Sequence, residues 1–201
     1  MNALLCRGLA DPVHDSGRIF RRLLAALAQP GQPANLLDAF AGLEDAPSGA
    51  ARPLAAALLA LADFETPVWL DRDAEGLVRS LVNFHCGAPL VDEPRQARFG
   101  VVTETDKMPP LSAFDWGSAE YPDRGATLLI SVANLEGGRP MTLTGPGIAT
   151  ATTFAPQGLP DHFWSQRTIM QKEFPCGVDC FLFDDHRVAG LPRTTQVRED
   201  Q

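Results

Sequence analysis

The sequence predicts an α/β fold in which helices cover a mixed β-sheet. Helical patterns alternate with short apolar segments along the chain, which is the order expected of a layered α/β/α sandwich. At least two pairs of strands are separated only by a turn, so part of the sheet should be antiparallel. The chain has 201 residues, of which 45% are hydrophobic. This is enough for one well-covered core, and we expect a single domain spanning residues 1–201.

The first helix is predicted between Asp15 and the Pro30-Gly31 pair, which should end it. Asp15 and Ser16 can cap its start through their side-chain oxygens. Apolar residues then recur at helical spacing, and they are Ile19, Phe20, Leu23, Leu24 and Leu27. Three arginines share the opposite side, namely Arg18, Arg21 and Arg22. A solvated helix face is the simpler interpretation of these arginines, and a surface for a partner is the main alternative.

Two further helices and two strands follow in the first half of the chain. Residues 54–64 are rich in alanine and leucine without a polar face, which predicts a helix that is buried or lies at an interface. Residues 66–71 and 98–103 are short predicted strands. Between them an amphipathic helix should end at Gly87, and its apolar side carries Leu77, Val78, Leu81, Val82 and Phe84.

The middle of the chain predicts a first hairpin. Residues 126–133 form the strongest predicted strand. Gly137-Gly138 should then turn the chain back, so that residues 140–144 pair with this strand. Asp161 can cap a later helix that runs to about residue 173.

A second hairpin is predicted near the C-terminus. Residues 180–183 and 187–191 should pair around a tight turn at Asp184-Asp185. His186 could act as a base beside one of these carboxylates, but neighbours in a tight turn splay apart and face solvent. The turn is therefore favoured over a catalytic site, and the sequence shows no catalytic triad.

The charge and hydropathy of the chain exclude some classes of partner. A formal net charge of −8 and a pI near 4.9 give no general electrostatic attraction to nucleic acid or anionic lipid. No run approaches the roughly 18 apolar residues of a membrane span, and no basic segment precedes an apolar one as in a signal peptide. We expect a cytoplasmic protein that binds neither nucleic acid nor membrane.

Cys176 and Cys180 suggest a metal or thiol centre at first sight. In an extended strand they would lie roughly 13 Å apart at about 3.3 Å per residue. That separation exceeds the roughly 7 Å limit for the Cα atoms of a disulfide and the reach of shared metal ligation. A bend at Gly177 could shorten it, but a zinc site would still need two more ligands. A metal centre is therefore the minor hypothesis, and all four cysteines are expected to be free thiols.

Two segments could bind an anion. Residues 143–148 end a predicted strand in a glycine-rich turn, whose backbone amides could hold a phosphate. Pro146 removes one of those amides, and the segment lacks the ending of a P-loop, so an ordinary turn is favoured. After the last hairpin, Arg193, Thr194 and Thr195 could hold an anion or a neighbouring chain.

Several short motifs together give a resemblance over essentially the whole chain. In order they are Phe20-Arg-Arg-Leu-Leu24 with Pro30-Gly31, Asp63 with Thr66-Pro-Val-Trp-Leu70, Phe84-His85 with Ala88-Pro-Leu-Val91, Gly125-Ala-Thr-Leu128, Gly137-Gly-Arg139, Leu143-Thr-Gly145 with Gly147-Ile148, and Phe174-Pro175, Gly177 and Asp179 with Pro192-Arg-Thr-Thr195. Each motif alone is weak, but the combination in this order is specific. The chain resembles the PhnH family, the H subunits of bacterial carbon–phosphorus lyase systems.

The resemblance implies a cytoplasmic protein of phosphonate catabolism that forms a homodimer and joins a core complex with the G, I and J subunits. It also implies a fold similar to the large domain of pyridoxal-phosphate-dependent transferases, but without that cofactor. A Schiff base would need a lysine near the site. The two lysines of the chain are Lys107, in a proline-flanked loop, and Lys172, on a predicted exposed helix. We therefore expect no cofactor and no metal.

The family acts with the G, I and L proteins to transfer the ribose-triphosphate part of ATP to the phosphonate, with release of adenine. The nucleosidase-type chemistry is assigned to the I subunit. The resemblance thus implies an accessory subunit of this transferase complex, α-D-ribose 1-methylphosphonate 5-triphosphate synthase, with no independent activity and no catalytic residue. The alternative is a protein that binds a nucleotide or phosphonate at its own site in a homodimer interface.

Six polar residues are the candidates for ligand contacts, namely Arg21, Arg22, Asp179, Arg193, Thr194 and Thr195. A charged group at the end of a strand or helix can equally be a structural tie, and this role is favoured. Asp179 and Arg193 distinguish the two roles. An ion pair between them would favour architecture, and an open pocket between them would favour a ligand.

Overall fold

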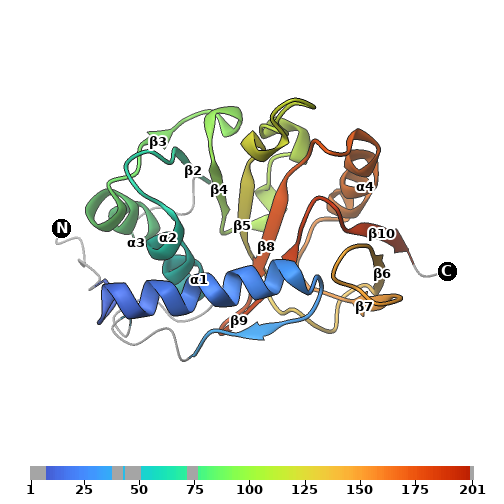
Figure 1. Ribbon diagram of the computed structural model, residues 1–201, viewed down its shortest axis with the longest axis horizontal. Coiled ribbons are helices and arrows are strands. Elements are labelled where there is room, and N and C mark those ends of the chain that lie inside the picture. Colours follow the sequence, from blue (N-terminus) through green and yellow to red (C-terminus); the bar gives the residue numbers. More distant parts are fainter. Residues whose placement is uncertain (1–7, 38–42, 44–50, 72–76, 200–201) are drawn as a thin grey trace.

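The computed structural model describes residues 8–37, 43, 51–71 and 77–199, which form an α/β fold around a seven-stranded sheet (Figure 1). In spatial order its strands are β1 (Ala34–Asn35), β9 (Arg187–Leu191), β8 (Asp179–Phe183), β5 (Thr127–Ser131), β4 (Phe99–Val102), β2 (Val68–Leu70) and β3 (Leu90–Val91). The five strands from β8 to β3 are parallel to one another, whereas β9 is antiparallel to both of its neighbours. The predicted α/β class with a mixed sheet is confirmed.

Three helical segments cover one face of this sheet. They are α1 (Pro12–Ala28), α2 (Ala51–Leu61) and α3 (Leu77–Leu81), which continues as a π-helical turn over Val82–Cys86. Ile19 and Leu23 of α1 share a buried cluster with Phe181 and Phe183 of β8. Alternate residues of β8 point the other way, since successive side chains of a strand face opposite sides.

The other face of the sheet is covered by α4 (Asp161–Met170) and by a small second sheet. Cys180 and Leu182 of β8 lie in a second buried cluster with Phe163 of α4. The small sheet consists of β10 (Gln196–Glu199), β6 (Met141–Thr144) and β7 (Thr152–Phe154), paired in that order and antiparallel. The molecule is therefore layered, but one outer layer contains strands as well as a helix.

The first predicted hairpin is wrong. Residues 126–133 contain β5, which pairs with β4 and β8 on its two sides, so no edge is left for residues 140–144. The glycine pair carries the chain into the second sheet instead. A Cβ on Gly138 would lie 2.1 Å from the carbonyl oxygen of Pro156, so glycine allows the two backbones to approach. Gly137-Gly138 therefore turn the chain as predicted, but the strand that follows them pairs in the other sheet.

Helix α1 differs from the prediction in its start and in its exposed side. Its N-cap is Asp11, whose carboxylate accepts the backbone N–H of His14 at 3.2 Å. Asp15 is buried inside the first turn and pairs with Arg18. Phe20 and Leu24, predicted on the packed side, are exposed to solvent.

Helix α2 confirms the prediction of a buried apolar helix, but it ends at Leu61, and Phe64 at the predicted end is exposed. All residues from Leu54 to Leu58 are completely buried, and α1 packs against this helix. The following amphipathic segment is only partly as predicted. Gly87 ends it with a positive φ of 62°, but Phe84 is exposed rather than packed. The π-helical turn, in which Gly87 N–H donates to Val82 O at 2.9 Å, changes the register of the last side chains.

The second hairpin is confirmed, but the expectation that the carboxylates of its turn face solvent is wrong for Asp184. β8 and β9 pair from Cys180 with Leu191 to Phe183 with Val188. Asp184 is buried at the turn, where its carboxylate accepts the N–H groups of His186 at 3.2 Å and Arg187 at 2.8 Å. The carboxylate therefore stabilises the turn. Within the described part of the chain, no helix combines the length and the apolar character that a membrane crossing requires.

Candidate functional site

The antiparallel hairpin brings Asp179 and Arg193 together, although they are fourteen positions apart. Asp179 begins β8, and Arg193 follows the end of β9. The Asp179 carboxylate accepts the backbone N–H of Arg193 at 2.7 Å, its Nη2 at 2.7 Å and its Nε at 3.2 Å. The two side chains are only 21% and 13% exposed. This ion pair meets the criterion for an architectural role.

The remaining nitrogen of the Arg193 guanidinium, Nη1, also forms a hydrogen bond. It donates to the carbonyl oxygen of Pro122, in the loop before β5. Gly125 makes room for this contact, because a Cβ there would lie 2.9 Å from Nη1 and 2.4 Å from the carbonyl oxygen of Gly177. Arg193 therefore ties three segments of the chain together.

Arg167 is a further member of this cluster that sequence reasoning missed. It lies on α4, is completely buried, and donates to the carbonyl oxygens of Val178 at 3.0 Å and Pro192 at 2.7 Å. Burial lowers its pKa, but the pKa of a guanidinium is high enough that the charge remains. One signal could have found it: Arg167 shares a helical face with Phe163 and Met170, which also pack into the core.

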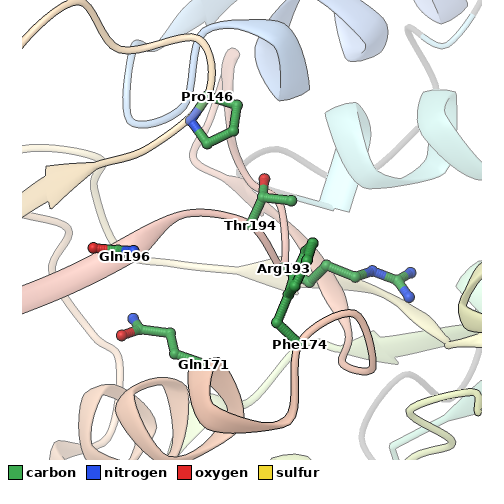
Figure 2. A pocket seen from close by; sticks show the side chains of 6 residues that line it. All are labelled: Pro146, Gln171, Phe174, Arg193, Thr194 and Gln196. Carbon is green, nitrogen blue, oxygen red and sulfur yellow. The ribbon is translucent and has the colours of Figure 1, made fainter. Parts of the chain in front are cut away.

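A surface pocket of about 280 Å³ lies beside this cluster, and Figure 2 shows its lining, which is Pro146, Gln171, Phe174, Arg193, Thr194 and Gln196. Arg193 contributes its aliphatic part, since the guanidinium points away from the other lining residues. The polar groups that remain for a ligand are uncharged: the amides of Gln171 and Gln196 and the hydroxyl of Thr194. The pocket is thus suited to hydrogen bonding rather than to charge pairing.

The six predicted contact residues do not form one site. Arg193 and Thr194 line the pocket, whereas Asp179 lies behind it in the ion pair. Thr195 is fully buried, and its hydroxyl has no hydrogen-bond partner among the described residues. Arg21 and Arg22 lie on the exposed side of α1 and do not line the pocket.

The glycine-rich turn at Gly145-Pro146-Gly147 is a packing element. Ile148 N–H donates to Gly145 O at 3.1 Å, which closes the turn. A Cβ on Gly145 would lie 3.0 Å from the carbonyl oxygen of Thr194, and one on Gly147 would lie 2.2 Å from that of Ala28. The turn therefore fits between α1 and the segment that carries Arg193, as the favoured interpretation expects.

The cysteines lie in different surroundings. Cys180 is buried within β8, and burial raises the pKa of its thiol to about 11. Cys176 lies outside the strand and is half-buried. Burial also raises the pKa of Cys86 to about 11. Within the described ranges, no three His, Cys, Asp or Glu side chains form a group that could hold a metal.

Comparison with known proteins gives three findings. The sequence model of a family described as "Bacterial phosphonate metabolism protein (PhnH)" matches residues 7–198. A protein of Rhizobium meliloti (strain 1021), named alpha-D-ribose 1-methylphosphonate 5-triphosphate synthase subunit PhnH, is 37% identical over 192 residues, which cover 95% of this chain and 94% of that protein. A putative C-P lyase subunit protein HtxG of Stutzerimonas stutzeri is 41% identical over 81 residues, covering 40% of this chain and 42% of the relative.

Proposed function

Because the chain belongs to the PhnH family of bacterial phosphonate metabolism proteins, we propose that it is an accessory subunit of a carbon–phosphorus lyase system. The observation that carries this proposal is the 37% identity to a named synthase subunit over nearly the full length of both proteins. In this role the chain has no activity of its own and acts with the G, I and L proteins, which transfer ribose triphosphate from ATP to the phosphonate.

The contacts of the candidate residues support an accessory role. Asp179 and Arg193 bond to each other, and Arg193 also bonds to Pro122. Arg167 likewise donates hydrogen bonds to two backbone carbonyl groups of the chain. These charged groups stabilise the junction between β8, β9 and α4 through bonds to groups of the chain itself.

The family resemblance also suggests finer features of this role. We propose a cytoplasmic homodimer that joins a core complex with the G, I and J subunits. We further propose that the single domain shares its fold with the large domain of pyridoxal-phosphate-dependent transferases but holds no such cofactor. The positions of the lysines support the last point: Lys107 and Lys172 lie outside the pocket lining, and Lys107 pairs with Glu104 at 2.6 Å.

Co-expression tests the accessory role. The chain is produced together with the G, I and J subunits from one system, purified through a tag on the I subunit, and studied by native mass spectrometry. We expect a stable complex that contains this chain. Only free chain, beside a complex of the other subunits, would contradict the proposal.

A second candidate function is the binding of a nucleotide or phosphonate. The observation that favours it is the pocket beside Arg193, where Gln171, Thr194 and Gln196 supply polar groups. Calorimetry with ATP and with methylphosphonate tests it on the isolated protein. Thr194→Val is the appropriate variant, because Arg193→Ala would also break the ion pair with Asp179. Equal heats for wild type and Thr194→Val would remove this candidate.

A further inference from the structure

Helix α1 has a second apolar side that nothing in the described chain covers. Ile19 and Leu23 pack into the core, whereas Val13, Phe20 and Leu24 are 78%, 49% and 55% exposed. The exposed three follow the spacing i, i+7 and i+11, which places them in one row along the helix. Figure 1 shows α1 lying across the front of the molecule, with no other helix or strand over it.

Gly17 lies in the same row, at i+4 from Val13. Glycine in the middle of a helix is less favourable than alanine. The fold does not require it, because an added Cβ would meet only the end of the flexible Arg21 side chain, at 3.7 Å. A glycine with free space outside it is useful where another chain approaches the helix backbone closely.

The exposed charges beside this row are positive. Arg21 lies beside this row and is exposed, whereas Arg18 lies farther around the helix and forms an ion pair with Asp15. Asp15, the carboxylate inside the helix, is buried against Arg18, and Asp11 lies at the N-terminal end. This local positive charge contrasts with the net charge of −8 for the whole chain. A partner that matches the row would be apolar at its centre and acidic at its rim.

We propose that the α1 outer face, formed by Val13, Gly17, Phe20, Arg21 and Leu24, binds a different subunit of the complex through an apolar and acidic surface of that subunit. The inference rests on the proposed accessory function. Beyond that function, the inference specifies the surface of this chain that makes the contact and the chemical character of the partner surface. The predicted apolar stripe of α1 thus serves two contacts, one inside the chain and one outside it.

A second copy of this chain fits the same face less well. In a two-fold antiparallel pairing of two α1 helices, symmetry keeps both arginine-bearing flanks on the same side of the contact. The two Arg21 side chains would then lie on the same side of the contact, and like charges placed together oppose association. An acidic partner surface avoids this repulsion.

Leu24→Glu tests the proposal within the co-expressed complex of the G, I and J subunits. It places a carboxylate in the apolar row, where it opposes an acidic partner and can neutralise Arg21, and we expect the affinity of this chain for the complex to fall by about tenfold or more. Ile169→Glu is the matched control, since Ile169 is equally exposed, at 57%, but lies on α4. Circular dichroism melting of each isolated variant shows whether the fold is kept.

The outcomes separate the two proposals. If wild type and Ile169→Glu assemble and Leu24→Glu does not, while all three melt alike, the docking face is supported. Equal assembly of all three overturns it and leaves the accessory function intact. If the wild type itself does not assemble, the accessory function fails. If Leu24→Glu converts an isolated dimer into a monomer, the face binds a second copy and the proposal is wrong.

Gly17→Ala gives an independent readout. Alanine should raise the melting temperature of the isolated protein, because it favours the helix and has room for its Cβ. It should nevertheless lower the affinity for the complex, because the methyl group occupies the place of close approach. A variant that is both more stable and fully able to assemble would contradict the close contact.

Discussion

At the scale of single residues, Asp179 and Arg193 are the central pair of the candidate site. Each is mostly buried and depends on the other for charge neutralisation. We expect Asp179→Asn to lower the free energy of unfolding by about 2–4 kcal/mol, because it leaves a partly buried guanidinium without its carboxylate. Urea unfolding measures this change. Thr194→Val, one position from Arg193, should stay within about 0.5 kcal/mol of wild type, and a similar loss in both variants would argue against the ion pair as the cause.

Asp184 should make stability depend on pH in the acidic range. Burial raises the pKa of this carboxyl, but the hydrogen bonds from the Arg187 side chain and from the N–H groups of His186 and Arg187 outweigh it, so the pKa lies below the ordinary value of 3.8. The ionised group therefore contributes stability above the unfolded pKa, and this contribution is lost as pH falls through the folded pKa. Thermal melts from pH 6 to pH 2 should show a steeper loss below about pH 4 for wild type than for Asp184→Asn. Parallel curves would contradict this role.

Sequence reasoning singled out Asp179 and Arg193 but left open whether they form an ion pair or flank a pocket, and it missed the part played by Arg167. The two residues are close because both flank a hairpin, and antiparallel strands bring such positions together. Arg167 lies on a helix whose apolar and polar residues alternate without a clear face, and its partners are backbone carbonyls. Carbonyl groups leave no trace in the sequence, so the only signal that this arginine is buried is its spacing from Phe163 and Met170.

At the scale of elements, the turn at Gly145-Pro146-Gly147 is expected to act through packing. Gly147→Ala would place a Cβ 2.2 Å from Ala28 O and at a φ of +84°, so a backbone must shift. Gly87→Ala is the control, because Gly87 also has a positive φ, of 62°, but no atom lies within 4 Å of its added Cβ. We expect Gly87→Ala to lose about 1–2 kcal/mol and Gly147→Ala clearly more. Urea titration compares them, and equal losses would mean that the turn does not need its close contact with α1.

The errors in the predicted elements share one physical cause. The periodicity of α1 correctly identified a helix, but Phe20 and Leu24 face solvent rather than the core. Likewise, Gly137-Gly138 correctly identified a turn, but the strand after it joined another sheet. Local patterns determine whether a segment is helix, strand or turn, whereas the surface that it contacts depends on distant parts of the chain.

At the scale of the whole molecule, the two buried clusters share the central sheet. Phe181 and Phe183 of β8 belong to one cluster, and Cys180 and Leu182 of the same strand belong to the other. If one cluster lost its packing, the sheet that carries the other cluster would be exposed to water on one face. We therefore expect one cooperative unfolding transition. Calorimetry and circular dichroism should give the same midpoint and a single peak. Two separate transitions would mean that the layers are independent units.

The α/β class with a mixed sheet followed from the order of the elements, and the family followed from motifs spread over the chain. Many of those motif residues now have a structural explanation. Gly125, Gly145 and Gly177 allow close approaches around Arg193 and Thr194, and Gly147 allows a close approach to Ala28 at the end of α1. Phe20 and Arg21 have no such explanation among the residues that the structure describes, which is why the α1 outer face is assigned to a contact with another subunit.

The release of adenine tests the central claim, that this chain is an accessory subunit without activity of its own, most directly. Adenine is measured by chromatography after incubation of ATP and methylphosphonate with the isolated chain, with the G, I and L proteins, and with all four together. We expect substantial release of adenine only when all four proteins are present. Adenine release by the isolated chain, or equal release by the G, I and L proteins without it, would contradict the account.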